Sequence, residues 1–130
     1  MNKLVTILSF SSRKNGNCIA ISNYISKYYK NCHTTIIDWE SVSACGGCDY
    51  ECFKPAMQCP HVSHEYQHLM NTVCNSDLVY FIVPNYCGYP CANYFAYNER
   101  SVGYFNLDRE KMEHYMNIPK RFIIVSNTGL

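Results

Sequence analysis

Short apolar runs rich in β-branched residues alternate along this chain with stretches whose apolar residues recur every three or four positions. The apolar runs cover residues 4–8, 34–37, 78–83 and 121–125. The stretches with helical spacing cover residues 18–29, 62–74 and 108–116. Strands that alternate with helices form parallel sheets with right-handed crossovers. We therefore predict an α/β fold in which Asp108 caps the last helix and residues 87–106 form a loop with a short helix at residues 91–97.

Composition narrows the class of protein. The chain has 130 residues, of which 48% are hydrophobic, enough for one compact domain. Its net charge is only +1 and the basic residues are scattered, so we expect no nucleic-acid partner. The first apolar run is too short for a signal peptide or a membrane span, so we expect a cytoplasmic protein with no membrane partner. In that compartment nine cysteines indicate thiols, metal ligands or redox centres rather than structural disulfides.

A loop of small polar residues joins the first apolar run to the first helical stretch. A strand, such a loop and a helix together present backbone N–H groups and a helix N-terminus to a phosphate. The Ser11 hydroxyl, the Asn15 and Asn17 amides and the Arg13 charge would add to this site. The patterns of a nucleotide-hydrolysing P-loop and of a dinucleotide fingerprint are absent. The alternative is an ordinary loop in which Asn17 caps the helix.

Residues 10–18 read Phe-Ser-Ser-Arg-Lys-Asn-Gly-Asn-Cys. They resemble the Gly-Ser-Pro-Arg-Lys-Asn-Gly-Asn-Thr loop of the flavodoxin-like NAD(P)H-dependent FMN reductases, which wraps the FMN phosphate. Phe10, Ser12 and Cys18 differ from the family loop, and Cys18 replaces a hydroxyl with a thiol, a weaker donor. The resemblance implies that FMN is bound here by Ser11, Arg13, Asn15, Asn17 and Cys18.

Two later loops should lie at the same edge of the sheet, because ligands bind outside the carboxyl ends of parallel strands. Residues 84–90 resemble the family's Ser-Pro-Val-Tyr loop along the flavin ring, and Pro84 and Tyr86 match it. A tyrosine beside backbone N–H groups can stack on the ring; packing of Tyr86 on the next helix is the alternative. Residues 126–129 stand where the family has its other flavin-edge loop. The implied flavin contacts are Pro84, Asn85, Tyr86, Cys87, Gly88, Ser126, Asn127, Thr128 and Gly129.

The resemblance also implies a fold. The family's strand order 2-1-3-4-5 fits the four apolar runs as order 2-1-3-4, a flavodoxin-like doubly wound parallel sheet. We expect residues 1–130 to form a single FMN-binding domain that is C-terminally incomplete, with the fifth strand missing from this chain. Residues 121–125 would then form an edge strand with apolar surface that a helix normally covers. A truncated product and a partner chain that supplies the cover are both open explanations.

Four cysteines within fifteen residues are the most concentrated chemistry in the sequence. They are Cys45, Cys48, Cys52 and Cys59, and two glycines between the first pair would let the backbone turn tightly. A [4Fe–4S] cluster, a zinc ion and a set of free or redox-active thiols are all compatible with this pattern. The segment resembles the cysteine loop of FMN reductases and the compact motif of iron–sulfur flavoproteins. That motif typically runs Cys-x₂-Cys-x₂-Cys, whereas the spacings here are x₂, x₃ and x₆.

The resemblance implies an FMN-dependent oxidoreductase that takes a hydride from NAD(P)H and passes electrons to a small molecule or a redox protein. The flavin carries this chemistry, so we expect no catalytic side chain. The competing class is a non-enzymatic electron-transfer or metal-binding redox protein that uses the loop at residues 45–59. Aromatic residues are concentrated at residues 86–105, and the resembled reductases commonly form dimers with the cofactor near the interface. Together these two features predict a homodimer. A monomer whose aromatic residues pack on its own sheet is the alternative.

Overall fold

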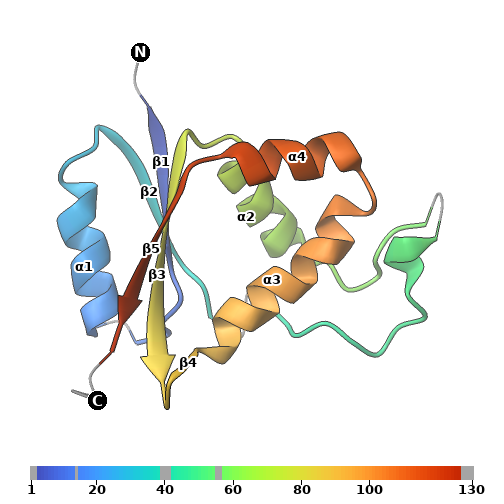
Figure 1. The fold of residues 1–130 in the computed structure, drawn as a ribbon, viewed down its shortest axis with the longest axis horizontal. Coiled ribbons are helices and arrows are strands. Elements are labelled where there is room, and N and C mark those ends of the chain that lie inside the picture. Colours follow the sequence, from blue (N-terminus) through green and yellow to red (C-terminus); the bar gives the residue numbers. More distant parts are fainter. Residues whose placement is uncertain (1–2, 14, 39–41, 55–56, 127–130) are drawn as a thin grey trace.

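The computed structural model of this chain describes residues 3–13, 15–38, 42–54 and 57–126. Its centre is an open sheet with helices on both faces (Figure 1). Four strands pair in parallel in the order β2-β1-β3-β5. They are β1 (Leu4–Ser9), β2 (Asn31–Ile36), β3 (Leu78–Tyr86) and β5 (Lys120–Val125). The prediction of a parallel α/β sheet is confirmed, and the four apolar runs are neighbours in the expected order.

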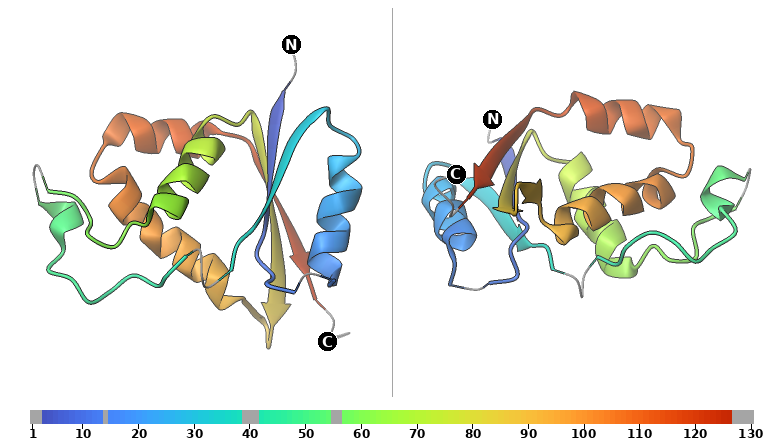
Figure 2. Two further views of the ribbon diagram at one scale, coloured as in Figure 1. Left: turned by 180° about the vertical axis from the view of Figure 1, so that it is seen from behind. Right: turned by 60° about the horizontal axis from the view of Figure 1, so that its bottom comes forward.

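The helices divide unequally between the two faces of the sheet. Figure 2 shows α1 (Asn17–Ser26) alone on one face and the other three helices on the opposite face. These are α2 (His64–Cys74), α3 (Ala92–Phe105) and α4 (Arg109–Asn117). The Asp108 side chain accepts a hydrogen bond from the Lys111 backbone N–H and caps α4, as predicted. The N-cap of α1 is Gly16 rather than Asn17.

A hydrophobic core lies on each face of the sheet. Leu8 and Phe81 pack against α2 and α3 on one face, whereas Val5 and Ile7 pack towards α1 on the other. This alternation follows from the strand geometry, because successive side chains point to opposite faces. The larger core contains three buried tyrosines, Tyr66, Tyr97 and Tyr104, and the Tyr66 hydroxyl donates a hydrogen bond to the Tyr97 carbonyl at 2.6 Å.

Helix α3 is longer than the sequence predicts. The pattern indicated a short helix at residues 91–97, but α3 continues to Phe105. Its second half buries an arginine, Arg100, and carries Gly103, so no apolar run marks it in the sequence. Contacts with other elements stabilise this part of the helix and override its weak local signal.

The chain between β2 and α2 runs out to the side of the molecule that lies away from α1 (Figure 1). Its described regular structure is one short 3₁₀ turn, η1 (Glu51–Phe53). At the carboxyl end of β3, β4 (Tyr89–Pro90) pairs antiparallel with that strand. No helix in the described ranges is long and apolar enough to cross a membrane.

Candidate functional site

The loops after β1 and β3 meet at the carboxyl edge of the sheet, beside the N-terminus of α1. They enclose a hollow of about 190 Å³. It is lined by Ser11, Arg13, Gly16, Asn17, Cys18, Pro84, Asn85, Tyr86 and Val125. Two segments some seventy positions apart therefore form one surface, and most of the expected contacts in these two loops lie on it.

Of the expected residues that the structure describes, Asn15, Cys87, Gly88 and Ser126 do not line this hollow. Asn15 and Ser126 are exposed to solvent, although Val125, which precedes Ser126, reaches the hollow. Cys87 and Gly88 form the turn between β3 and β4, with φ of 51° and 82°. Asn127, Thr128 and Gly129 fall outside the described residues, so the third loop stays a prediction.

The charge around the hollow suits an anion. Arg13 is exposed at its rim, and no described lining residue is acidic. The Arg13 backbone N–H donates to Ser11 Oγ at 3.3 Å, which orders the loop. Helix α1 has no side-chain cap and no acidic residue in its first turn. The positive end of its dipole is therefore not neutralised by its own side chains.

A polar atom without a partner lies directly before the loop. Ser9, the last residue of β1, is fully buried, and its Oγ has no hydrogen-bond partner within the described structure. Buried polar atoms are nearly always paired, with protein groups or with bound molecules. This orphaned hydroxyl is compatible with a polar ligand or ordered water beneath the loop.

Phe10 stands where the resembled loop has a glycine, and its side chain points into the core. Its ring lies 5.9 Å from Phe81 and makes edge contacts with Tyr94 and Tyr97. Its carbonyl accepts a hydrogen bond from the Cys91 thiol at 3.3 Å. The substitution thus anchors the loop to the start of α3 without filling the hollow.

Cys18 stands where the loop that this sequence resembles has a threonine. Its side chain lines the hollow but is only 3% exposed. Burial raises the pKa of the Cys18 thiol above its ordinary value of 9.0, and the neighbouring Cys91 raises it further. The thiol is therefore protonated at neutral pH and places no negative charge against a phosphate.

The cysteine loop at residues 45–59 forms a second candidate site on the far side of the molecule from α1. Cys45, Cys48 and Cys52 line a hollow of about 330 Å³ together with side chains of α3. Cys59 lines a neighbouring hollow of about 360 Å³. Burial raises the pKa of the Cys52 thiol, with further contributions from Cys59, Cys48 and Cys45 in that order. The Cys52 thiol is therefore within electrostatic reach of the other three.

All nine cysteines lie in the described ranges as free thiols. Within those ranges no group of three or more histidine, cysteine or acidic side chains is close enough to hold a metal ion. Sequence reasoning missed Arg100, whose guanidinium Nη1 donates to Cys59 Sγ at 3.8 Å. In the sequence, the sign that Arg100 is buried was that it is a single basic residue on a helix face whose other residues include Ala96, Tyr97 and Tyr104.

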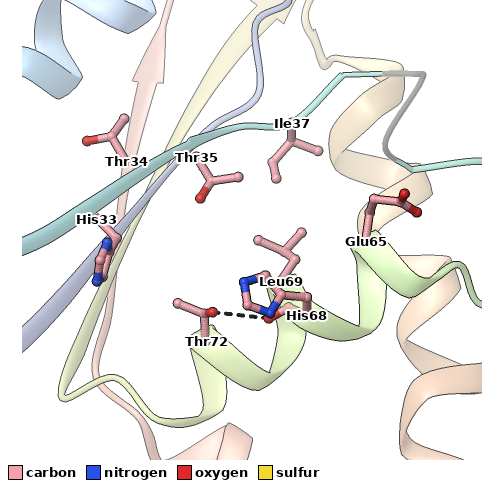
Figure 3. A pocket seen from close by; sticks show the side chains of 8 residues that line it. All are labelled: His33, Thr34, Thr35, Ile37, Glu65, His68, Leu69 and Thr72. Carbon is pink, nitrogen blue, oxygen red and sulfur yellow. Dashed lines mark hydrogen bonds between the residues drawn. The ribbon is translucent and has the colours of Figure 1, made fainter.

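A third hollow, of about 440 Å³, lies between β2 and α2 (Figure 3). His33 and Glu65 stand at its opposite ends, with His68 between them. The Thr72 hydroxyl donates to the His68 carbonyl within the helix. This hydrogen bond does not orient a polar group towards the hollow. His68 is exposed, as is His64. This hollow therefore supplies no convergent chemistry.

No family model matches the chain, and no curated protein matches it.

Proposed function

We propose that this chain is a flavodoxin-like, FMN-dependent oxidoreductase similar to the NAD(P)H-dependent FMN reductases. One observation carries the proposal: the loop at residues 11–18 and the end of β3 line a single hollow next to the N-terminus of α1. Anions bind at such helix ends, and ligands of open α/β sheets bind outside the carboxyl ends of the strands. The strand order β2-β1-β3-β5 is compatible with this fold.

The hollow fits one part of FMN, its phosphate end, and leaves the flavin ring outside. The hollow of about 190 Å³ is smaller than the roughly 300 Å³ at which typical ligand pockets begin. It therefore suits the phosphate end of the cofactor, with Ser11, Arg13 and the first turn of α1 as its partners. The flavin ring would lie outside it, against Tyr86, whose side chain is 49% exposed. Bound FMN would supply the hydride and electron transfer.

The rest of the proposal follows from that chemistry. NAD(P)H is the co-substrate, and a small molecule or a redox protein accepts the electrons. The described lining offers no histidine or carboxylate, which supports a role of the protein in binding and orienting rather than in proton transfer. Nine free thiols suit a reducing, cytoplasmic environment.

Titration of the purified chain with FMN tests this proposal, with NAD(P)H oxidation as the second readout. Removing the Ser11 hydroxyl in Ser11→Ala should weaken FMN binding by about 1–2 kcal/mol, because a hydrogen bond to a charged phosphate is lost. Ser12→Ala is the matched control, since Ser12 is exposed and does not line the hollow, and its affinity should not change. A wild-type chain that does not bind FMN would remove the proposal.

A second candidate function is favoured by the thiols that line one hollow. In this view the chain is an electron-transfer or metal-binding redox protein, and Cys45, Cys48, Cys52 and Cys59 hold a [4Fe–4S] cluster or a zinc ion. Four thiols are the donor set of both centres, so the residues fit in kind and number, although the side chains must gather to bind. Metal analysis and the absorbance of protein purified without oxygen test this candidate.

We also propose a homodimer. Phe95 on α3 and Phe122 and Ile124 on β5 are exposed apolar side chains, and Tyr94 contacts both phenylalanine rings. Exposed aromatic clusters are typical of interface cores. The expected contribution of residues 86–105 is supported by Phe95, and β5 extends the same surface.

A further inference from the structure

Cys45 and Cys48 are two thiols separated by a pair of glycines in the cysteine loop. Gly46 and Gly47 have φ of 144° and 72°, in the region that favours glycine. A Cβ on either glycine would meet no atom within 4 Å, so glycine is needed here for the backbone conformation and not for space. The chain bends at both cysteines. A bent Cys-x-x-Cys segment is typical of thiol pairs that exchange with disulfides.

The start of this segment is fixed to α3 by a buried arginine. Arg100 Nε and Nη2 donate to the Ser43 carbonyl at 3.3 and 3.2 Å, and Nη2 also donates to Ser43 Oγ at 3.1 Å and to the Ala44 carbonyl. Ala44 directly precedes Cys45 in the chain. These hydrogen bonds therefore set the position of the first thiol relative to the helix.

The other end of the cysteine loop is fixed by two further residues on the same face of α3. A Cβ on Gly103 would lie 2.7 Å from Cys59 Cβ and 2.8 Å from its Sγ, so the close approach of this segment to α3 requires glycine. Asn106 Nδ2 donates to the Met57 carbonyl at 2.8 Å. Because Arg100, Gly103 and Asn106 follow one another at intervals of three, one helix face holds both ends of the loop.

The thiols of this segment open into a hollow with apolar walls. Its volume of about 330 Å³ reaches the roughly 300 Å³ at which typical ligand pockets begin. Tyr50, Phe53 and Val102 line it and are all exposed, and the rings of Tyr50 and Phe53 lie 6.4 Å apart. Glu99 is the charged residue of the described lining. Aromatic side chains favour an apolar or aromatic substrate, and the carboxylate disfavours an anionic one.

The three cysteines that line this hollow differ in exposure. Cys45 is exposed, Cys48 is half-buried and Cys52 is buried. Burial raises the pKa of the Cys52 thiol above its ordinary value, which keeps it protonated at neutral pH. Because the thiolate is the nucleophile, Cys52 does not compete with the other two. An exposed attacking thiol and a half-buried second thiol therefore stand at the hollow.

We propose that Cys45 and Cys48 form a redox-active dithiol that reduces neutral disulfides carrying an aromatic or other apolar group. The Cys45 thiolate attacks one sulfur of the substrate disulfide, a mixed disulfide forms, and the first substrate thiol leaves. Cys48 then attacks the Cys45 sulfur, the bond between the two cysteines forms, and the second substrate thiol leaves. The substrate gains two electrons and the two protons of the pair, and an external thiol or dithiol reduces the pair again. This step needs neither FMN nor a metal, so it rests on neither candidate function.

The test uses the full chain, reduced, treated with a chelator and handled without oxygen. The probe is dithiodipyridine, a neutral aromatic disulfide that releases the coloured product thiopyridone. Cys87 is the other exposed thiol and lies in the β3–β4 turn, outside the hollow. Cys87→Ser is therefore both a control and the background in which Cys45→Ser and Cys48→Ser are made. Stopped-flow absorbance measures thiopyridone release, and mass spectrometry after alkylation identifies the disulfides formed.

We expect one equivalent of probe to release two thiopyridones per wild-type chain and to leave a disulfide between Cys45 and Cys48. Cys87→Ser should behave in the same way. Cys48→Ser should release one thiopyridone and retain the mixed disulfide on Cys45, because the second thiol is missing. Cys45→Ser should react about tenfold more slowly, because the remaining cysteine is half-buried.

A second pair of variants tests the class of substrate. Phe53→Ala should slow the reaction with dithiodipyridine about fivefold, because part of a ring contact is lost. It should leave the rate with hydroxyethyl disulfide unchanged, because that neutral disulfide has no ring. Phe95→Ala is the matched control: Phe95 is also an exposed phenylalanine, but it does not line the hollow.

Each outcome supports or overturns the inference. A wild-type chain that forms no disulfide between Cys45 and Cys48, or a Cys48→Ser chain that still releases two thiopyridones, overturns the dithiol. Equal rates of Phe53→Ala and wild type with dithiodipyridine overturn the substrate class. A chain that keeps a metal ion on these cysteines after chelation overturns the inference and supports the second candidate function instead. The wild-type disulfide is detected without any substitution, so the result stands even where a variant does not fold.

Discussion

At the scale of single residues, Phe10 and Cys18 are the informative differences from the loop that this sequence resembles. Phe10 is explained by packing, because its side chain turns into the core between α3 and the sheet. Cys18 also packs in a core, the one on the α1 face of the sheet, but its thiol lines the hollow as well, where the resembled loop has a hydroxyl. The first substitution therefore leaves the proposed phosphate site unchanged, whereas the second alters its donors.

Replacement of Cys18 by threonine should tighten FMN binding. A hydroxyl donates a stronger hydrogen bond than the protonated thiol, and one improved donor to a phosphate contributes on the order of 1 kcal/mol. Isothermal titration with FMN measures the gain. Cys32→Thr is the control, because Cys32 lies on β2 away from the hollow, and it should bind as wild type does. Weaker binding by Cys18→Thr would mean that the loop holds the phosphate in another way.

At the scale of elements, the β3–β4 hairpin combines a tight turn with exposed aromatic residues. Tyr86 pairs with Tyr89 across the two strands, and Cys87 and Gly88 connect them. Both connecting residues have positive φ, as the two-residue type I′ turn requires. Glycine adopts this conformation at little cost, whereas cysteine is strained in it.

Cys87→Asn should stabilise the chain by about 0.5–1 kcal/mol, because asparagine tolerates the left-handed conformation better and Asn-Gly is the favoured pair for this turn. Denaturant unfolding under reducing conditions measures the change in the free energy of unfolding. Gly88→Ala provides the opposite case and should destabilise by about 1 kcal/mol, since alanine is strained at φ of 82°. Equal stability of all three proteins would show that the turn is not formed in solution.

The elements differ in how visible they are in the sequence. β1 and β3 were predictable because both faces of these strands are buried and their residues are continuously apolar. β2 begins at Asn31, three residues before its predicted start, because this edge strand exposes Asn31 and His33 and needs no apolar run there. The second half of α3 was hidden because its determinants, Arg100 and Gly103, act through contacts with a distant segment.

The candidate sites also differ in how far they could be predicted from the sequence. The loops at the strand ends could be brought together from the sequence alone, because a parallel sheet places all carboxyl ends at one edge. The anchoring of the cysteine loop could not, since the partners of Arg100 lie more than forty positions away and carry no local pattern. The hollow between β2 and α2 was also missed, because its lining is neither periodic nor rich in one kind of group.

At the scale of the whole molecule, the outer strand β5 leaves apolar surface uncovered. Phe122 is 51% exposed although it stacks on Phe81 with ring centroids 4.6 Å apart, and Ile124 is 57% exposed on the same face of the strand. Phe95 of α3 lies beside this face, linked to Phe122 through Tyr94. Tyr94 itself packs on Phe10, so it belongs to the interior more than to the exposed patch.

Light scattering at several concentrations should show a dimer for the wild-type chain. Phe95→Lys combined with Ile124→Lys should give a monomer, because two charges on each copy would be buried against the partner. Tyr24→Lys is the control: Tyr24 is an equally exposed aromatic residue, but it lies on α1 across the sheet. A monomer mass for wild type at every concentration would remove the dimer, and a dimer that survives the double substitution would place the interface elsewhere.

The anchoring of the cysteine loop through one face of α3 has a consequence for how related chains can differ in sequence. Loop closure becomes only slowly more costly with length, so the spacing of the cysteines can drift without disturbing the sheet. Related chains can therefore gain, respace or lose this segment while the loops of the proposed FMN site stay unchanged. In an alignment of related chains, Arg100, Gly103 and Asn106 should then vary together with the four cysteines and independently of Ser11 and Tyr86.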